Sequence, residues 1–174
     1  SSNPFSPIVE AINNSLESIF QLEDGKEREI AINLHFNDQD ENSKILDFIE
    51  ISDSGVGFND ESFYRYERLL DKSKGFNNRG SGRLQYLHRF GEVSFRSIYY
   101  QGDGCYLRKF SSNKESFIYD DSSPIKVESE QPFTTLTLKH LRNHKQDQAA
   151  YSGLKFSGFI SWIKSQFALR AYLE

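Results

Sequence analysis

The sequence predicts an α+β fold, in which helices and a run of strands come from separate stretches of one domain. Segments with helical spacing open and close the chain, and two more flank a glycine-bearing stretch near residue 80. Segments with alternating apolar residues fill much of the rest, joined by turn residues. The 174 residues suit one domain with a proper core, so we expect residues 1–174 to form a single domain.

The composition excludes several classes of protein. Hydrophobic residues make up 37% and charged residues 26%, which is typical of a soluble globular domain. A net charge of −4 argues against nucleic-acid binding by this domain alone, because phosphate contacts require a basic face. The sequence contains no apolar run of the 18 or so residues that a membrane span requires. The single Cys105 excludes an internal disulfide and a cysteine-only metal site, and it fits a reducing cytoplasm.

The first half of the chain predicts a helix, two strands and a glycine turn. A helix over residues 8–21 is expected, with Ser6 as its cap and Pro7 in its first turn. Strands over 30–36 and 44–52 follow, joined by a polar loop over 37–43. On the helix, Glu10, Asn14 and Glu17 share a face that lies roughly 135° from the apolar stripe. That face is either an ordinary solvated surface or part of a site.

The second strand runs into Asp53-Ser54-Gly55-Val56-Gly57. Asp53 falls on the same face as Ile49 and Ile51, so its carboxylate needs a partner on an apolar floor. An ionised Asp is a hydrogen-bond acceptor and suits an exocyclic amine such as N6 of adenine. Gly55 and Gly57 allow a sharp turn and a close approach to a ligand. The alternative is a common Asp-Ser-Gly turn after a strand.

A second helix over 61–70, capped by Asn59 or Asp60, precedes a positive, glycine-bearing segment over 71–81 that we expect to be a mobile loop. Gly80-Ser81-Gly82 then opens a third helix over 83–90. Free N–H groups at such a helix start suit a phosphate, but glycines also simply make a loop flexible.

The remaining sequence predicts mainly strands. These cover 93–99, 105–110, 116–119 and 134–138, with a polar connection over 120–131. A polar, basic loop over 141–152 and an amphipathic helix over 156–173 complete the chain.

The order of these motifs resembles the GHKL ATPase family, which includes the gyrase ATPase subunit, the large heat-shock chaperone, histidine kinases, MutL and the MORC proteins. The resemblance covers about residues 7–138. It rests on Glu10-Ala11-Ile12-Asn13-Asn14, the Asp53 turn, Gly80-Ser81-Gly82 and Thr134-Thr135-Leu136-Thr137. It implies a Bergerat-type two-layer α/β sandwich, with a mixed, mostly antiparallel sheet, helices on one face, and ATP bound between the two layers.

The resemblance also implies individual roles. Asp53 would accept the adenine amine, Gly55 and Gly57 would bring the backbone close to the base, and Thr134 would support the hydrogen bonds on the adenine side. Asn14 would coordinate Mg²⁺, and Glu10 would act as the general base toward the attacking water. Gly80 and Gly82 would belong to a lid that covers the phosphates.

Some residues depart from the family pattern. Glu17 stands where many relatives carry Asp, and Phe133 stands where they usually carry Gly before the threonine. The lid is short, and its candidate phosphate contacts are Lys72, Lys74 and Arg83, with no basis for choosing among them. Related ATPases often take a catalytic lysine from a second domain, so turnover by this chain alone is expected to be slow.

These resemblances predict a cytoplasmic, Mg²⁺-dependent ATPase that acts as a nucleotide-driven conformational switch in a longer protein. Its partners would be ATP, other domains of that protein and a second protomer in an ATP-dependent homodimer. One alternative is a degenerate nucleotide-binding or interaction module without turnover. The other is a catalytic domain of the histidine-kinase type, against which Glu10 counts because those domains usually lack this glutamate.

Overall fold

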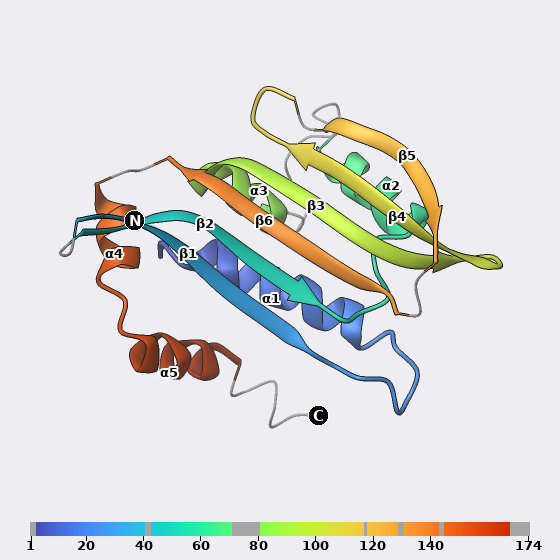
Figure 1. Cartoon of the computed structure of the whole chain (residues 1–174), viewed down its shortest axis with the longest axis horizontal. Coiled ribbons are helices and arrows are strands. Elements are labelled where there is room, and N and C mark those ends of the chain that lie inside the picture. Colours follow the sequence, from blue (N-terminus) through green and yellow to red (C-terminus); the bar gives the residue numbers. More distant parts are fainter. Residues whose placement is uncertain are drawn as a thin grey trace.

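The computed structural model describes residues 3–40, 43–70, 81–116, 118–128, 131–142 and 145–167. Its strands are β1 (Ile30–Asp40), β2 (Ser43–Asp53), β3 (Phe90–Gln101), β4 (Gly104–Ser112), β5 (Tyr119–Val127) and β6 (Phe133–Leu141). They form one sheet in the order β1-β2-β6-β3-β4-β5 (Figure 1). Every pairing between neighbouring strands is antiparallel, so the described sheet is wholly rather than mostly antiparallel.

Helices cover one face of this sheet. In Figure 1 the strands pass in front of α1 (Ser6–Ile19), α2 (Asp60–Leu70) and α3 (Ser81–Arg89). Two more helices follow β6, namely α4 (Gln146–Ser152), which contacts β2, and α5 (Phe156–Phe167). The predicted α+β fold, with helices on one face of the sheet, is confirmed.

The core lies between these two layers and is organised in rows across the strands. In one row Ile51 pairs with Leu136, Leu136 with Phe95, and Phe95 with Phe110. All four side chains are buried, and the Phe95 and Phe110 rings stack with centroids 4.6 Å apart. Ile8 of α1 belongs to the same cluster and is fully buried. The polar row next to this apolar row forms the candidate site.

Helix starts were predicted with mixed success. Asn59 caps α2, since the Ser62 N–H donates to its Oδ1 at 2.9 Å. The predicted cap at Ser6 is wrong, because α1 begins at Ser6 itself and its N-cap, Phe5, makes no side-chain capping hydrogen bond. The presence of Pro7 in the first turn is confirmed.

Two predicted connections are in fact regular elements. Residues 119–127 form β5, an edge strand that pairs only with β4 and leaves its polar side chains exposed, so its sequence lacks an alternating pattern. Residues 146–152 form α4, where Asp147 makes a buried ion pair with Arg89 of α3 at 2.6 Å. Tertiary contacts of this kind hold a helix too short to be stable alone.

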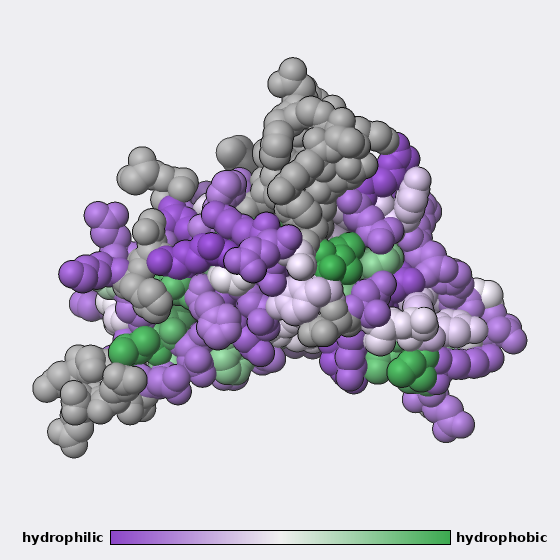
Figure 2. Space-filling view, turned by 90° about the horizontal axis from the view of Figure 1, so that it is seen from above, coloured by the Kyte–Doolittle hydropathy of each residue, from purple (hydrophilic) through white to green (hydrophobic). Residues whose placement is uncertain are grey.

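Most of the described surface in the view of Figure 2 is hydrophilic, with a few separate apolar patches. Among the described helices, none is long and apolar enough to cross a membrane. Two predictions fall outside the described residues, wholly or in part: the loop over 71–80 and the helix beyond residue 167.

Candidate functional site

A buried polar row crosses the sheet on the face that the helices cover. Asp53 of β2 pairs with Thr134 of β6, Thr134 with Ser97 of β3, and Ser97 with Arg108 of β4. Each of the four is at most 9% exposed. Buried polar groups require partners, so the contacts of this row determine what it does.

Asp53 is held by groups from α1 and from the turn that follows β2. The Ser15 hydroxyl donates to Oδ2 at 2.9 Å, and the Gly55 N–H donates to Oδ1 at 3.0 Å. Burial raises the pKa of Asp53 from 3.8 to about 6, against the opposing effect of hydrogen bonds from Ser15, Gly55 and Ser18. A carboxylate has room for about four hydrogen bonds, so Asp53 retains acceptor capacity beside these contacts.

A cavity of about 120 Å³ lies over this carboxylate, between α1, α2, α3 and the sheet. Four of the predicted site residues line it, namely Asn14, Asp53, Gly57 and Thr134. They come from stretches up to 120 residues apart, so the fold brings together residues that the sequence shows only as separate motifs. At the helical side, the cavity is also lined by Glu17, Gln21, Ser62 and Arg65.

The other predicted site residues lie elsewhere. Glu10 is half-buried, one turn before Asn14 on α1, and it is not among the described residues that line the cavity. Gly55 is also absent from the lining, since it supports Asp53 from the turn. Gly82 lies in the first turn of α3, while Gly80 lies outside the described residues.

The two glycines of the turn are required by its packing. Gly57 has φ +80°, and a Cβ there would lie 2.3 Å from the carbonyl oxygen of Ile98. A Cβ on Gly55 would lie 2.2 Å from the Ser18 hydroxyl oxygen and 2.8 Å from Oδ1 of Asp53. The turn therefore packs directly against β3 and α1, and its backbone forms part of the cavity wall.

Asn14 is held in place by a residue that the sequence did not indicate. Its Nδ2 donates to the hydroxyl of Tyr86, a buried residue of α3, at 2.8 Å. With one N–H of this amide used in this way, Oδ1 and the second N–H of Asn14 remain to bind a ligand. In the described part of the chain, no cluster of three or more His, Cys, Asp or Glu side chains is arranged as a metal site.

Thr134 lies opposite Asp53 in the sheet, and its Oγ1 is 2.9 Å from the Ser97 hydroxyl. Ser15, Tyr86, Ser97 and Arg108 were missed as functional candidates. Ser15 lies on the buried face of α1, and Arg108 shares the buried face of β4 with Phe110. A polar residue at a core position was therefore the available signal. Nothing in the sequence indicated that Tyr86 would meet Asn14.

Neither a protein-family model nor a curated protein sequence matches the chain. Among solved structures, the chain is similar to the ATPase region of Saccharomyces cerevisiae topoisomerase II, and to the same region bound to ICRF-187 (dexrazoxane). In both cases the identity is 18%, the TM-score is 0.49 and 87% of this chain is covered. The chain spans 39% and 40% of those two structures.

Proposed function

We propose that this chain binds ATP in the cavity between α1 and the sheet and hydrolyses it with Mg²⁺, as a conformational switch within a larger protein. One observation carries the proposal: Asn14, Asp53, Gly57 and Thr134, which come from three separate motifs, line one cavity over a buried acceptor. The resemblance of these motifs to the GHKL family assigns adenine to the Asp53 end. A buried carboxylate with spare acceptor capacity suits the adenine amine.

At the other end of the cavity, Asn14 would hold Mg²⁺ through Oδ1. An amide oxygen is a ligand type that Mg²⁺ accepts, and Mg²⁺ commonly combines one or two protein ligands with phosphate oxygens and waters. Bound in this way, the ion would offset charge on the phosphates. The hydrogen bond from Nδ2 to the Tyr86 hydroxyl supports this role, because it leaves Oδ1 available to a ligand.

Glu10 would be the general base toward the attacking water. It lies one turn from Asn14, so a modest change in α1 or in its side chain would bring the carboxylate to the phosphate end. Catalytic contacts are often longer before a substrate is bound, so its place outside the cavity lining is compatible with this role. Gly80, Gly82 and a cation from among Lys72, Lys74 and Arg83 would cover the phosphates.

A second candidate is a module that binds nucleotide without turnover. The position of Glu10 outside the described cavity lining favours it, while the Asp53 end is the same in both candidates. In the switch, lid closure would engage other domains or a second protomer. A cytoplasmic site of action fits the single, buried Cys105.

The test is a calorimetric titration of the chain with β,γ-imido-ATP, with and without Mg²⁺, followed by an assay of phosphate release from ATP. Magnesium-dependent binding with release of phosphate supports the ATPase. Binding without release would favour the module that only binds nucleotide. Failure to bind at millimolar analogue would contradict both.

A further inference from the structure

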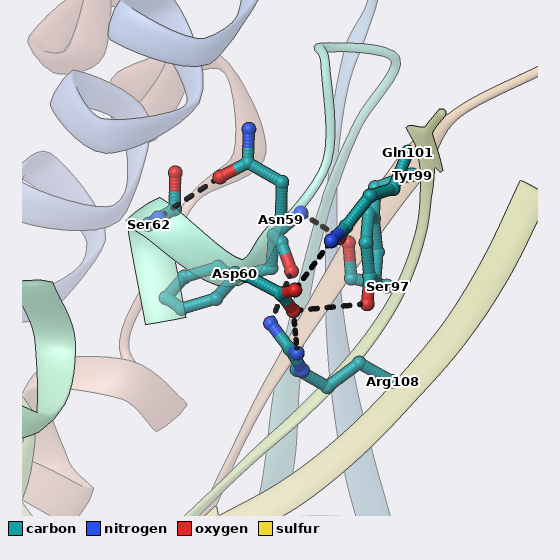
Figure 3. A network of polar contacts seen from close by, with 8 residues as sticks. Asn59, Asp60, Ser62, Ser97, Tyr99, Gln101 and Arg108 are labelled. Atoms are coloured by element: carbon teal, nitrogen blue, oxygen red, sulfur yellow. Dashed lines mark hydrogen bonds and ion pairs between the residues drawn. The ribbon is translucent and has the colours of Figure 1, made fainter. Parts of the chain in front are cut away.

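A network of side chains from β3 and β4 holds the backbone at the start of α2 (Figure 3). The Phe58 N–H donates to the Ser97 hydroxyl oxygen at 2.8 Å, and the Phe58 carbonyl oxygen accepts from Nη1 of Arg108 at 3.0 Å. Both main-chain polar groups of Phe58 are thus hydrogen-bonded to side chains of the sheet.

Arg108 is suited to this task by its burial and its shape. It is 5% exposed, and its second terminal nitrogen, Nη2, donates to Asp60, the first residue of α2. Its guanidinium carbon lies 4.4 Å from the Phe63 ring centroid and 5.1 Å from that of Tyr99. A planar guanidinium bonds in two directions at once, whereas the ammonium of a lysine is a compact point charge.

The Asp60 carboxylate contacts Arg108 from the solvent side, and we call Ser97, Arg108 and Asp60, which together hold the backbone at Phe58, the clamp. The carboxylate also accepts from the Gln101 amide, and with Arg108 this hydrogen bond lowers the pKa of Asp60. Arg108 therefore ties Phe58 and Asp60, on either side of the α2 cap Asn59, to strand β4.

The clamp continues into the cavity wall. Gly57 and Phe58 line the cavity, and the Ser97 hydroxyl that binds Phe58 also contacts Thr134 Oγ1 and the Phe133 carbonyl. All of these bonds are satisfied if Ser97 donates to Phe133 and accepts from Phe58 and Thr134. Arg108 itself is not among the described lining residues.

We propose that Arg108 is a positioning residue for the base-binding end of the cavity, where it fixes the Gly57–Phe58 wall without touching the ligand. This inference rests on the proposed nucleotide site. It concerns the base end rather than the phosphate end, because the hydrogen bonds of Arg108 go to Phe58 and Asp60, which follow Asp53 in the chain.

The variant that tests this role is Arg108→Lys, which keeps the charge and loses the two-directional contact. Titration with β,γ-imido-ATP should show binding about tenfold weaker, while affinity for inorganic tripolyphosphate should stay within about twofold. Asp60→Asn, a milder change at an exposed side chain, should weaken the analogue in the same direction by about threefold. Lys109→Met, on the neighbouring exposed position of β4, is the matched control and should change neither ligand.

Amide hydrogen exchange gives a readout that needs no nucleotide. The Phe58 N–H should exchange about tenfold faster in Arg108→Lys than in the wild-type chain, with core amides of β6 unchanged. Equal weakening of both ligands, or unchanged exchange at Phe58, would overturn the positioning role. Failure of the wild-type chain to bind the analogue would refute the proposed function and with it this role. Analogue binding that Arg108→Lys leaves intact would refute the role of Arg108 alone.

Discussion

The two ends of the cavity differ in how completely their polar groups are fixed. At the Asp53 end, the carboxylate is held from α1 and from the turn, and Thr134 is held by Ser97. At the end where the phosphates are proposed to bind, Tyr86 fixes the amide nitrogen of Asn14, but Glu10 lies outside the described cavity lining. The polar groups around Asp53 are therefore fixed without a ligand, whereas the proposed general base, Glu10, would still have to reach the cavity.

Because of this difference, we expect nucleotide binding and ATP hydrolysis to respond differently to substitutions. Preorganised groups recognise a ligand without the cost of ordering them, so adenine selectivity should survive changes that abolish turnover. Changes at the Asp53 end should instead alter the stability and base selectivity of the chain.

The largest effect is expected from Glu10→Gln. If Glu10 is the general base, ATP hydrolysis should fall by roughly 10²- to 10⁴-fold while analogue binding stays within about twofold. Glu17→Gln is the matched control, since Glu17 lies on the same helix and lines the cavity. Hydrolysis that persists in Glu10→Gln would remove Glu10 from the mechanism.

Gly57→Ala should destabilise the fold at the base end. Its positive φ and the 2.3 Å approach to the Ile98 carbonyl combine strain with a backbone overlap, which should lower the free energy of unfolding by about 3 to 5 kcal/mol. Gly25→Ala has a similar φ of +83° with open space around it, so it should cost about 1 to 2 kcal/mol. Equal effects in urea unfolding would mean that the packing of the turn on β3 contributes little.

Asp53 should make stability depend on pH. The folded pKa is about 6 and the ordinary value is 3.8, so the folded chain binds more protons than the unfolded chain between these values. The stabilisation from Asp53 is complete below about pH 4 and is lost as the pH rises through about 6, on the order of 3 kcal/mol in total. The difference in unfolding free energy between wild type and Asp53→Asn should decline by that amount over this range. A difference that is constant with pH would contradict the burial of an ionisable Asp53.

The smallest effects concern the phosphate end. Asn14→Ala should remove the Mg²⁺-dependent part of analogue binding, a loss of about tenfold. Tyr86→Phe keeps the buried ring and removes only the hydroxyl that holds Asn14, so it should weaken Mg²⁺-dependent binding by about threefold. Titrations of both variants with and without Mg²⁺ measure this, and a Mg²⁺ effect unchanged in Asn14→Ala would exclude Asn14 as a ligand.

Much of the fold follows from local patterns in the sequence. The strand that leads to Asp53 was predicted from alternating apolar residues, and the strand that carries Thr134 from its β-branched residues. The helix α1 was predicted from an apolar stripe of Val9, Ile12, Leu16, Ile19 and Phe20. The structure buries Ile12 and Ile19 of that stripe but leaves Phe20 exposed, and the buried face runs through Ile8 instead. The edge strand β5 was missed because it pairs with a neighbouring strand on one side and its exposed polar residues give no alternating apolar pattern. The helix α4 was missed because its stability comes from a tertiary contact, the ion pair of Asp147 with Arg89.

The sequence motifs predicted which residues belong to the candidate site, but not which neighbouring residues hold them in place. Asp53, Asn14 and Thr134 stood out through spacing and turn chemistry. The groups that hold them, Ser15, Tyr86 and Ser97, are common residue types whose positions depend on how helices pack on the sheet. Pairings between residues 37 to 72 positions apart carry no local signal.

The central claim is that Asp53 recognises the amine of adenine, and a comparison of ATP with ITP analogues tests it most directly. Hypoxanthine presents a carbonyl oxygen where adenine presents the amine, so it would face the carboxylate with an unpaired acceptor. Wild-type chain should bind β,γ-imido-ATP about 10- to 100-fold more tightly than its inosine counterpart in calorimetric titrations. Asp53→Asn, whose amide can donate to the carbonyl, should lose or reverse that preference. Equal binding of both analogues by the wild-type chain, or a preference for adenine that persists in Asp53→Asn, would contradict the account.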